Sequence, residues 1–120
     1  MKRLFAFIIT ALALSQNVFA VGIGLTNPVI LQSVAVIAGP LSAHKPGNIE
    51  VQIQGGFALP SGVSCDTNYI TTLKVVDPDG TMFSLLRDAR NSREPVSLWI
   101  TDSPNFTAFP GRCSIVAVIR

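Results

Sequence analysis

The sequence predicts a mainly β domain whose strands are interrupted by a single helix, and three observations support this fold class. Five short segments are rich in β-branched and aromatic residues, and they alternate with polar residues or run nearly continuously apolar. These segments are residues 29–37, 48–54, 69–77, 96–102 and 113–120. Only residues 81–91 place apolar residues at helical spacing. Clusters of Pro and Gly separate the segments.

A helix between the third and fourth of five strands is the element order of an OB-fold. This fold is a five-stranded, partly open Greek-key barrel. The alternative is an immunoglobulin-like β-sandwich, which typically has about seven strands and seldom a well-formed helix. We therefore expect residues 29–120 to form a single OB-like domain, preceded by a flexible mature N-terminus at residues 21–28, where Gly recurs.

Residues 1–20 have the composition of a cleaved signal peptide. A basic start (MKR) precedes an apolar run at residues 4–14, and the residues VFA at 18–20 offer a small-residue cleavage site. A membrane anchor is the alternative, but the run is shorter than the roughly 20 apolar residues that a spanning helix needs. The leader predicts a secreted or periplasmic protein with no membrane insertion after signal cleavage.

The charge balance changes once the leader is removed. Two of the nine basic residues, Lys2 and Arg3, lie in it, which leaves seven basic residues against seven acidic ones and no net charge. A neutral domain has no electrostatic basis for nonspecific nucleic-acid binding, so we expect no nucleic-acid partner. Low charge also gives weak mutual repulsion between copies, which favours a homo-oligomer.

The two cysteines, Cys65 and Cys113, allow only one intramolecular pairing. Because an exported chain meets an oxidising environment, we predict a disulfide between them. On the chain-entropy account it stabilises the fold by about 4 kcal/mol. The alternative is a free reactive thiol or a metal ligand, and no cluster of His or Cys lies near either cysteine in the sequence.

The first three predicted strands differ in pattern. Residues 29–37 are nearly all apolar, as expected of a strand covered on both sides. Residues 48–54 alternate, so Ile49, Val51 and Ile53 face the core while the polar residues between them face away. The third strand, residues 69–77, ends in a turn of sequence DPDG.

The helix is predicted to start with Thr81 as its N-cap. An apolar stripe follows at i, i+3, i+4 and i+7, formed by Met82, Leu85, Leu86 and Ala89. Pro95 ends the helix by residues 91–93. Two arginines, Arg87 and Arg90, lie near its C-terminal end, where they are either solvated charges or contacts to a neighbouring subunit.

Trp99 is expected to point away from the core. Residues 96–102 alternate, with Val96, Leu98 and Ile100 on one face and Trp99 on the other. Either a strand or the helix covers that opposite face, or Trp99 is outward and marks a subunit contact or a sugar-stacking platform.

The candidate ligand-binding residues lie mainly in two loops. OB-folds bind ligands on the face of strands 2 and 3 and through the loops between strands 1–2 and 4–5. Here those loops are residues 39–47 and 103–112. Together with Trp99, the candidates are His44, Lys45, Asn105, Phe106, Phe109 and Arg112. The two phenylalanines are either stacking surfaces or side chains tucked into the barrel rim.

No residue pattern predicts catalysis, so we expect a non-enzymatic protein without a cofactor or metal. His44 is the sole histidine and lies in a Pro- and Gly-rich loop, away from any candidate nucleophile. Asp77 and Asp79 could suggest a calcium loop, but Phe83 and Leu85 occupy positions where an EF-hand places ligands. The two aspartates are better explained by the turn.

The signal peptide, the strand and helix order and the Cys65/Cys113 pair resemble the B subunits of bacterial AB5 toxins. The segments MFSLLRDARNSREPVSLWI and GRCSIVAVI also resemble small secreted bacterial proteins with a similar helix, strand and Cys layout. Both are resemblances of architecture. They imply an OB-fold, a ring of five subunits with central helices, and carbohydrate recognition on the outside. No receptor-binding residue of these toxins maps onto this chain.

Two functional hypotheses follow. The first is an exported, non-enzymatic binding module that self-associates and recognises a glycan or a protein receptor. The second is a monomeric periplasmic protein that is structural or inhibits a partner enzyme through its Pro- and Gly-rich loops. Binding to immobilised glycans favours the first, and capture of an enzyme favours the second.

Overall fold

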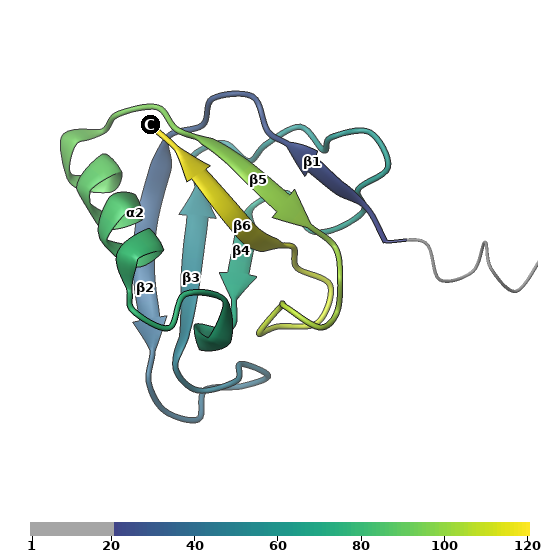
Figure 1. Ribbon diagram of the computed structural model, residues 1–120, viewed down its shortest axis with the longest axis vertical. Coiled ribbons are helices and arrows are strands. Elements are labelled where there is room, and N and C mark those ends of the chain that lie inside the picture. The colour runs from purple at the N-terminus through teal and green to yellow at the C-terminus, as the bar shows by residue number, and fades with distance from the viewer. Residues whose placement is uncertain (1–20) are drawn as a thin grey trace, which may run out of the picture.

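The computed structural model describes residues 21–120, so the predicted signal peptide lies outside the described residues. This part of the chain contains six strands and one α-helix, which lies along one side of the strands (Figure 1). In chain order they are β1 (Ile23–Leu25), β2 (Leu31–Ile37), β3 (Asn48–Ile53), β4 (Tyr69–Thr72), the 3₁₀ turn η1 (Lys74–Val76), α2 (Thr81–Ser92), β5 (Ser97–Thr101) and β6 (Ser114–Ile119).

The strands form two antiparallel three-stranded sheets, in the orders β1–β5–β6 and β2–β3–β4. The prediction of a mainly β fold that contains a helix is therefore confirmed. Figure 1 shows the two sheets layered over one another, with α2 along one side. The helix contacts both sheets through β2 and β6.

The core lies between the two sheets and under the helix. As the alternation predicts, Ile49, Val51 and Ile53 of β3 are buried, and so are Leu98 and Ile100 of β5. The helix adds Leu86 and Ala89 to the same cluster. Burial of such side chains removes apolar surface from water and is the main favourable term in the stability of the fold.

The two sheets are joined at two places outside the regular strands. Ile70 of β4 forms a parallel bridge with Cys113, where the Thr71 amide donates to the Cys113 carbonyl at 3.0 Å. On the other side of the core, Val29 forms an antiparallel bridge with Val96. Cys65 and Cys113 form the predicted disulfide, which ties the loop before β4 to the start of β6.

The N-terminal segment differs from the expectation of a flexible terminus. Ile23–Leu25 forms strand β1, which pairs antiparallel with β5 in the register Ile23 to Thr101 and Leu25 to Trp99. Asp102 holds this strand, because its Oδ1 accepts a hydrogen bond from the Gly22 amide at 2.8 Å. The strand was not predicted because the recurring Gly22 and Gly24 indicated a flexible segment, although Ile23 and Leu25 alternate with them.

The third predicted strand is shorter than expected. Regular pairing ends at Thr72, and the chain then forms η1, whereas the sequence suggested a strand to residue 77. Val75, counted as part of the strand, is exposed. The apolar residues of the sequence KVVD are thus typical of a strand, but they form a single helical turn at the surface.

The start of the helix differs from the prediction that Thr81 is its N-cap. Gly80, in the left-handed conformation, occupies the N-cap position in place of Thr81. The exposed amides are capped by Asp77, whose carboxylate accepts hydrogen bonds from the Met82 amide at 3.0 Å and the Phe83 amide at 2.9 Å. A carboxylate at this end is also favoured by the helix dipole.

The buried side of the helix is rotated slightly from the predicted stripe. Leu86 and Ala89 are buried and Met82 packs against the core, as expected, but Leu85 is exposed. Phe83 packs against the core in its place. Across the described residues, no helix is long and apolar enough to cross a membrane.

Candidate binding site

Two loops that are far apart in the sequence meet at one end of the molecule. The first joins β2 to β3 and the second joins β5 to β6. The Lys45 amide of the first loop donates to the Ala108 carbonyl of the second at 3.1 Å. The first loop is held in shape by a backbone hydrogen bond from His44 to Leu41 and by the Asn48 side-chain amide, which donates to the Lys45 carbonyl.

The loops enclose an open cavity of about 210 Å³, which we call the loop pocket. Its lining residues are Ala43, Lys45, Pro104, Thr107, Ala108, Phe109 and Pro110. Two of the predicted ligand-binding residues, Lys45 and Phe109, line it directly. The walls are mostly apolar, with Lys45 as the one charged side chain in the lining.

Beside Phe109 lies a charged cluster that holds the two loops to β3. The same carboxylate oxygen of Glu50, Oε2, lies 3.1 Å from His44 Nε2 and 3.1 Å from Arg112 Nη1. The His44 side chain is only 8% exposed. One carboxylate on the outer face of β3 therefore binds a residue from each loop.

Aromatic rings complete this cluster. The Arg112 guanidinium carbon lies 3.9 Å from the centre of the Phe109 ring and 4.5 Å from that of Tyr69. The His44 ring packs against Phe109 at 4.8 Å between centroids. A cation held between two rings and a carboxylate is fixed in position, so Phe109 forms a stiff wall of the loop pocket.

The structure thus brings together four of the predicted site residues, His44, Lys45, Phe109 and Arg112. Two further members of the cluster, Glu50 and Tyr69, were not among the predicted site residues. Glu50 was assigned to the polar face of its strand, which is correct, but alternation alone does not identify the groups a polar side chain meets across a loop. Tyr69 is the first residue of its predicted strand, and the alternation of that strand does not indicate what its side chain contacts.

The polar groups around the loop pocket differ in their availability to a ligand. The Thr107 hydroxyl is bonded within the protein, to Thr71 Oγ1 at 3.0 Å and to the Phe109 carbonyl at 2.8 Å. Lys45 is exposed and makes no ion pair with any residue in the range 21–120. Its ammonium group is therefore the free hydrogen-bond donor of the pocket.

Asn105 and Phe106 lie in the second loop but do not line the pocket. The backbone of Phe106 is structural, because its carbonyl accepts hydrogen bonds from the Leu73 amide at 3.0 Å and the Ser114 hydroxyl at 2.7 Å. Its side chain is exposed, as is Asn105. These two side chains are surface features of the loop.

Trp99 is exposed, in agreement with the alternative in which it faces outward from its strand. It lies on a surface that is separate from the loop pocket. It lies on β5 between Leu25 of β1 and Ala117 of β6. It is not among the residues that line the loop pocket. Its role must therefore be considered separately from that of the loops.

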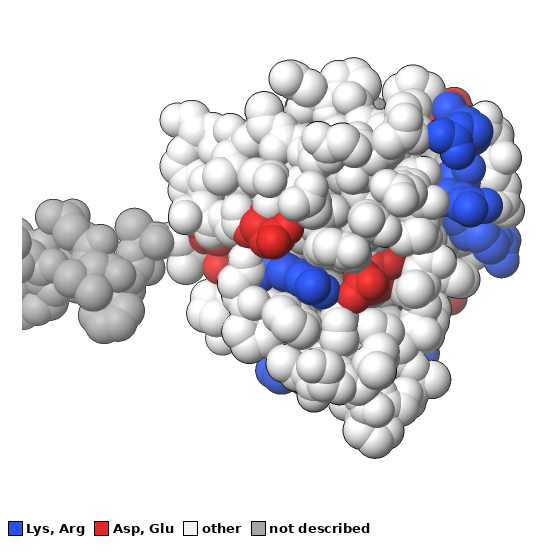
Figure 2. Space-filling view, turned by 180° about the vertical axis from the view of Figure 1, so that it is seen from behind, with Lys and Arg blue, Asp and Glu red and all other residues white. Residues whose placement is uncertain are grey.

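The helix arginines lie at another edge of the molecule. Figure 2 shows Lys and Arg atoms gathered along the side where α2 lies, and mixed charges near the centre of the same view. Arg87 is exposed and pairs with Asp88 at 3.4 Å. Arg90 donates to the Gln32 carbonyl at 3.3 Å, at an irregularity in the pairing of β2 with β3. Arg90 thus supports a strand, while Arg87 remains a surface charge.

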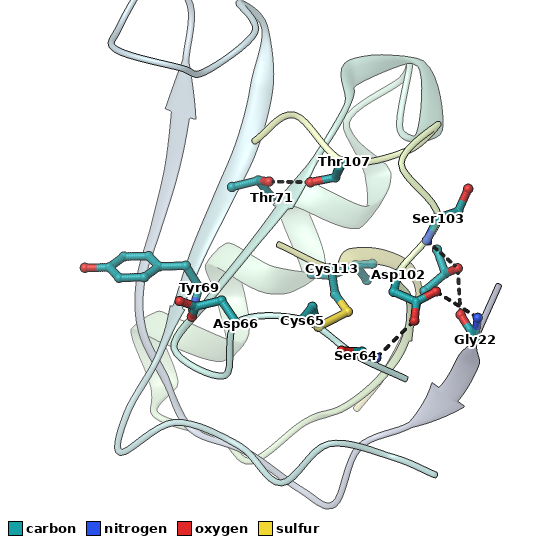
Figure 3. Close-up of a disulfide and its surroundings, with 12 residues drawn as sticks. Gly22, Ser64, Cys65, Asp66, Tyr69, Thr71, Asp102, Ser103, Thr107 and Cys113 are labelled. Carbon is teal, nitrogen blue, oxygen red and sulfur yellow. Dashed lines mark hydrogen bonds between the residues drawn. A yellow bond between two sulfur atoms is a disulfide. The ribbon is translucent and has the colours of Figure 1, made fainter. Parts of the chain in front are cut away.

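The disulfide stiffens the frame behind the second loop. Figure 3 shows Cys65 and Cys113 next to Asp102, whose carboxylate accepts hydrogen bonds from the amides of Gly22 and Ser64. The second of these measures 3.0 Å. Asp102 thereby joins β1, the loop before β4 and the end of β5, so the second loop starts from a fixed point.

Within residues 21–120, no group of three or more His, Cys, Asp and Glu side chains is arranged to hold a metal ion. In comparisons with known proteins, the chain matches no protein-family model, no curated protein and no solved structure.

Proposed function

We propose that the protein is an exported, non-enzymatic binding module that takes its ligand in the loop pocket. The observation that carries this proposal is the meeting of the two loops, recorded by the 3.1 Å hydrogen bond from Lys45 to Ala108. Segments about sixty residues apart in the chain form one concave site, and convergent loops on a rigid scaffold are a common place for ligand recognition.

We further propose that the two sheets are parts of one OB-type barrel. The bridge between Ile70 and Cys113 links β4 towards β6, and the bridge between Val29 and Val96 links the start of β2 towards β5. These contacts give a circular order of strands. In such a barrel the two loops of the pocket are the ones that OB-folds use for binding, which supports the assignment of the pocket as the site.

The chemistry of the pocket supports a glycan or a receptor segment as the ligand. Phe109 and the two prolines offer apolar surface, and Lys45 offers a charged donor. A sugar ring presents both an apolar C–H face and hydroxyl groups, which suits an aromatic wall beside a hydrogen-bond donor. This role is similar to that of the receptor-binding B subunits that the sequence resembles.

The surroundings of His44 support a non-enzymatic role. Its Nε2 faces Glu50 and its ring is packed against Phe109, so the imidazole connects the first loop to β3 and to the second loop. A general base needs access to the proton that it removes. A side chain that is this deeply buried and already bonded is better suited to support than to proton transfer.

Binding of the chain without residues 1–20 to a panel of immobilised glycans tests the proposal. We expect binding that is weakened at least tenfold by Lys45→Ala or Phe109→Ala. Arg87→Ala is the matched control, because it removes one positive charge from α2 and should leave binding unchanged. If no glycan binds and the protein instead captures an enzyme from periplasmic extract, the inhibitor hypothesis replaces this one.

A further inference from the structure

Both backbone groups of Gly22 are held by the end of β5. The Gly22 amide donates to Asp102 Oδ1 at 2.8 Å, and its carbonyl accepts hydrogen bonds from the Thr101 hydroxyl at 2.9 Å and the Asp102 amide at 3.2 Å. Gly22 also lies against the loop before β4, since a Cβ atom placed on it would come within 1.9 Å of the Gly62 carbonyl oxygen. The chain is therefore fixed in position at residue 22.

The Asp102 carboxylate is fixed in position but has no cation beside it. Its two oxygens accept hydrogen bonds from the amides of Gly22 and Ser64 (Figure 3). An ionised carboxylate offers about four acceptor sites, so these bonds do not use all of them. Within residues 21–120, Asp102 forms no ion pair with a Lys, Arg or His side chain. A cation close to this half-buried carboxylate would therefore be stabilised.

The predicted removal of residues 1–20 creates such a cation. Hydrolysis of the peptide bond between Ala20 and Val21 consumes one water, leaves a carboxylate on Ala20 and places both hydrogens of the water on the Val21 nitrogen. The uncharged peptide amide thereby becomes an α-ammonium group, and an α-amino group is mostly protonated at pH 7. The new charge is one residue away from Gly22.

Covalent geometry limits the distance between the two charges. The nitrogen atoms of consecutive residues lie at most about 4 Å apart. Because the Gly22 nitrogen lies 2.8 Å from Asp102 Oδ1, the Val21 nitrogen lies within about 7 Å of this oxygen. Val21 is exposed, and rotation about its Cα–C bond brings the freed ammonium group closer once the leader is gone.

We propose that the α-ammonium group of Val21 binds the Asp102 carboxylate, so that removal of the leader fastens β1 to β5. Opposite charges at this separation attract each other, and more strongly where one of them is partly withdrawn from water. The carboxylate is already held by two amides, so little conformational freedom is lost when the pair forms. In the uncleaved chain the same nitrogen is an uncharged amide, and this attraction is absent.

Strand β1 has few other contacts that hold it in place. It is three residues long and pairs with β5 alone. Its side chains Ile23 and Leu25 are exposed, and Gly24 between them adds no side chain to the core. Segments with few buried apolar contacts are the first to open. A charge pair at the first residue of the cleaved chain therefore determines how firmly β1 is docked, whether or not the loop pocket binds a ligand.

The experiment compares three forms of the chain that differ only at the N-terminus. The first begins at Val21, the second begins at Val21 with an acetylated amine, and the third begins at Ala20. Acetylation removes the charge, whereas the third form keeps the charge and moves it by one residue. We expect the acetylated form to unfold roughly 2–6 °C below the first form, with the third form between them.

Hydrogen exchange of the Asp102 amide gives a local readout. This amide donates to the Gly22 carbonyl, so it is protected only while β1 is docked. Its hydrogen should exchange about fivefold faster in the acetylated form than in the form with a free amine. The Lys45 amide, which donates to the Ala108 carbonyl beside the loop pocket, is the control and should exchange at an unchanged rate.

A pair of variants tests whether Asp102 is the partner of the ammonium group. In Asp102→Asn the carboxylate charge is gone, so acetylation should cause no further loss of stability. Glu94→Gln is the matched control, because it removes a carboxylate that pairs with Arg120 instead. Acetylation should lower its unfolding temperature as much as in the unaltered protein. The comparison of the three N-terminal forms decides the proposal even if Asp102→Asn does not fold.

The proposal is overturned by any of three results. The first is an exported protein, made from the full chain in a bacterial host, whose N-terminal sequence does not begin at Val21. The second is an acetylated form with the same unfolding temperature and the same exchange at Asp102 as the form with a free amine. The third is an equal effect of acetylation in folded Asp102→Asn, which places the ammonium group on another partner. Glycan binding at the loop pocket is measured separately from all three.

Discussion

Glu50 and Arg112 are 62 residues apart in the sequence and form an ion pair of 3.1 Å between Oε2 and Nη1. The pair is largely buried, with 20% and 16% of the side chains exposed. It connects the centre of β3 to the end of the second loop. The Arg112 guanidinium is at the same time stacked on Phe109, so the position of the pocket wall depends on this pair.

Replacement of Glu50 by Gln should therefore destabilise the protein and weaken binding at the loop pocket. Arg112 would lose its charged partner while largely buried, which costs about 1–3 kcal/mol of unfolding free energy. Urea unfolding measures the loss. The control is Glu94→Gln, which breaks the more exposed pair with Arg120 and should cost less than about 1 kcal/mol. Equal losses in the two variants would show that Glu50 is not a buried anchor.

The helix cap gives a second prediction. Asp77→Ala should cost about 1–2 kcal/mol, because two amides at the start of α2 lose their acceptor. Thr81→Ala, at the position that the sequence suggested as the cap, should cost less than about 0.5 kcal/mol. Chemical denaturation of both variants gives the comparison. A larger loss for Thr81→Ala than for Asp77→Ala would contradict the capping role of Asp77.

These two sites illustrate which features can be predicted from the sequence. Alternation oriented β3 and β5 correctly, because a strand with one buried face has a period of two residues. The helix was found for the corresponding reason, since an apolar stripe at helical spacing needs a face to pack against. The cap was assigned wrongly, because a cap is a matter of backbone geometry over several residues, and both Asp77 and Thr81 have suitable side chains.

Other features could not be predicted because their cause lies elsewhere in the chain. β1 is a strand only because β5 and the backbone near Gly62 are beside it. In the candidate site, Lys45 and Phe109 were predicted because Pro and Gly mark the two loops in the sequence. The roles of Glu50 and Tyr69 depend on a tertiary contact with Arg112, for which no local pattern exists.

The disulfide gives a third prediction. Reduction of the Cys65–Cys113 bond should lower the unfolding free energy by about 2–4 kcal/mol, because the loop that it closes becomes free in the unfolded chain. Urea unfolding with and without a thiol reductant measures the difference. The double variant Cys65→Ala/Cys113→Ala should be as unstable as the reduced protein, and the reductant should not affect it. A reduced protein that unfolds at the same urea concentration as the oxidised one would contradict this prediction.

The close packing of β1 gives the last prediction. Gly22→Ala would place a methyl group 1.9 Å from the Gly62 carbonyl oxygen, which is fixed in the backbone, so β1 has to move away from the loop or from β5. We expect a loss of about 1–3 kcal/mol in unfolding free energy. The Thr26 amide, which donates to the Leu98 carbonyl next to β1, should exchange its hydrogen faster.

Gly39→Ala is the matched control, because a Cβ atom there meets nothing within 4 Å and the variant should be as stable as the unaltered protein. Unchanged exchange at Thr26 in Gly22→Ala would show that β1 is not held in the position described.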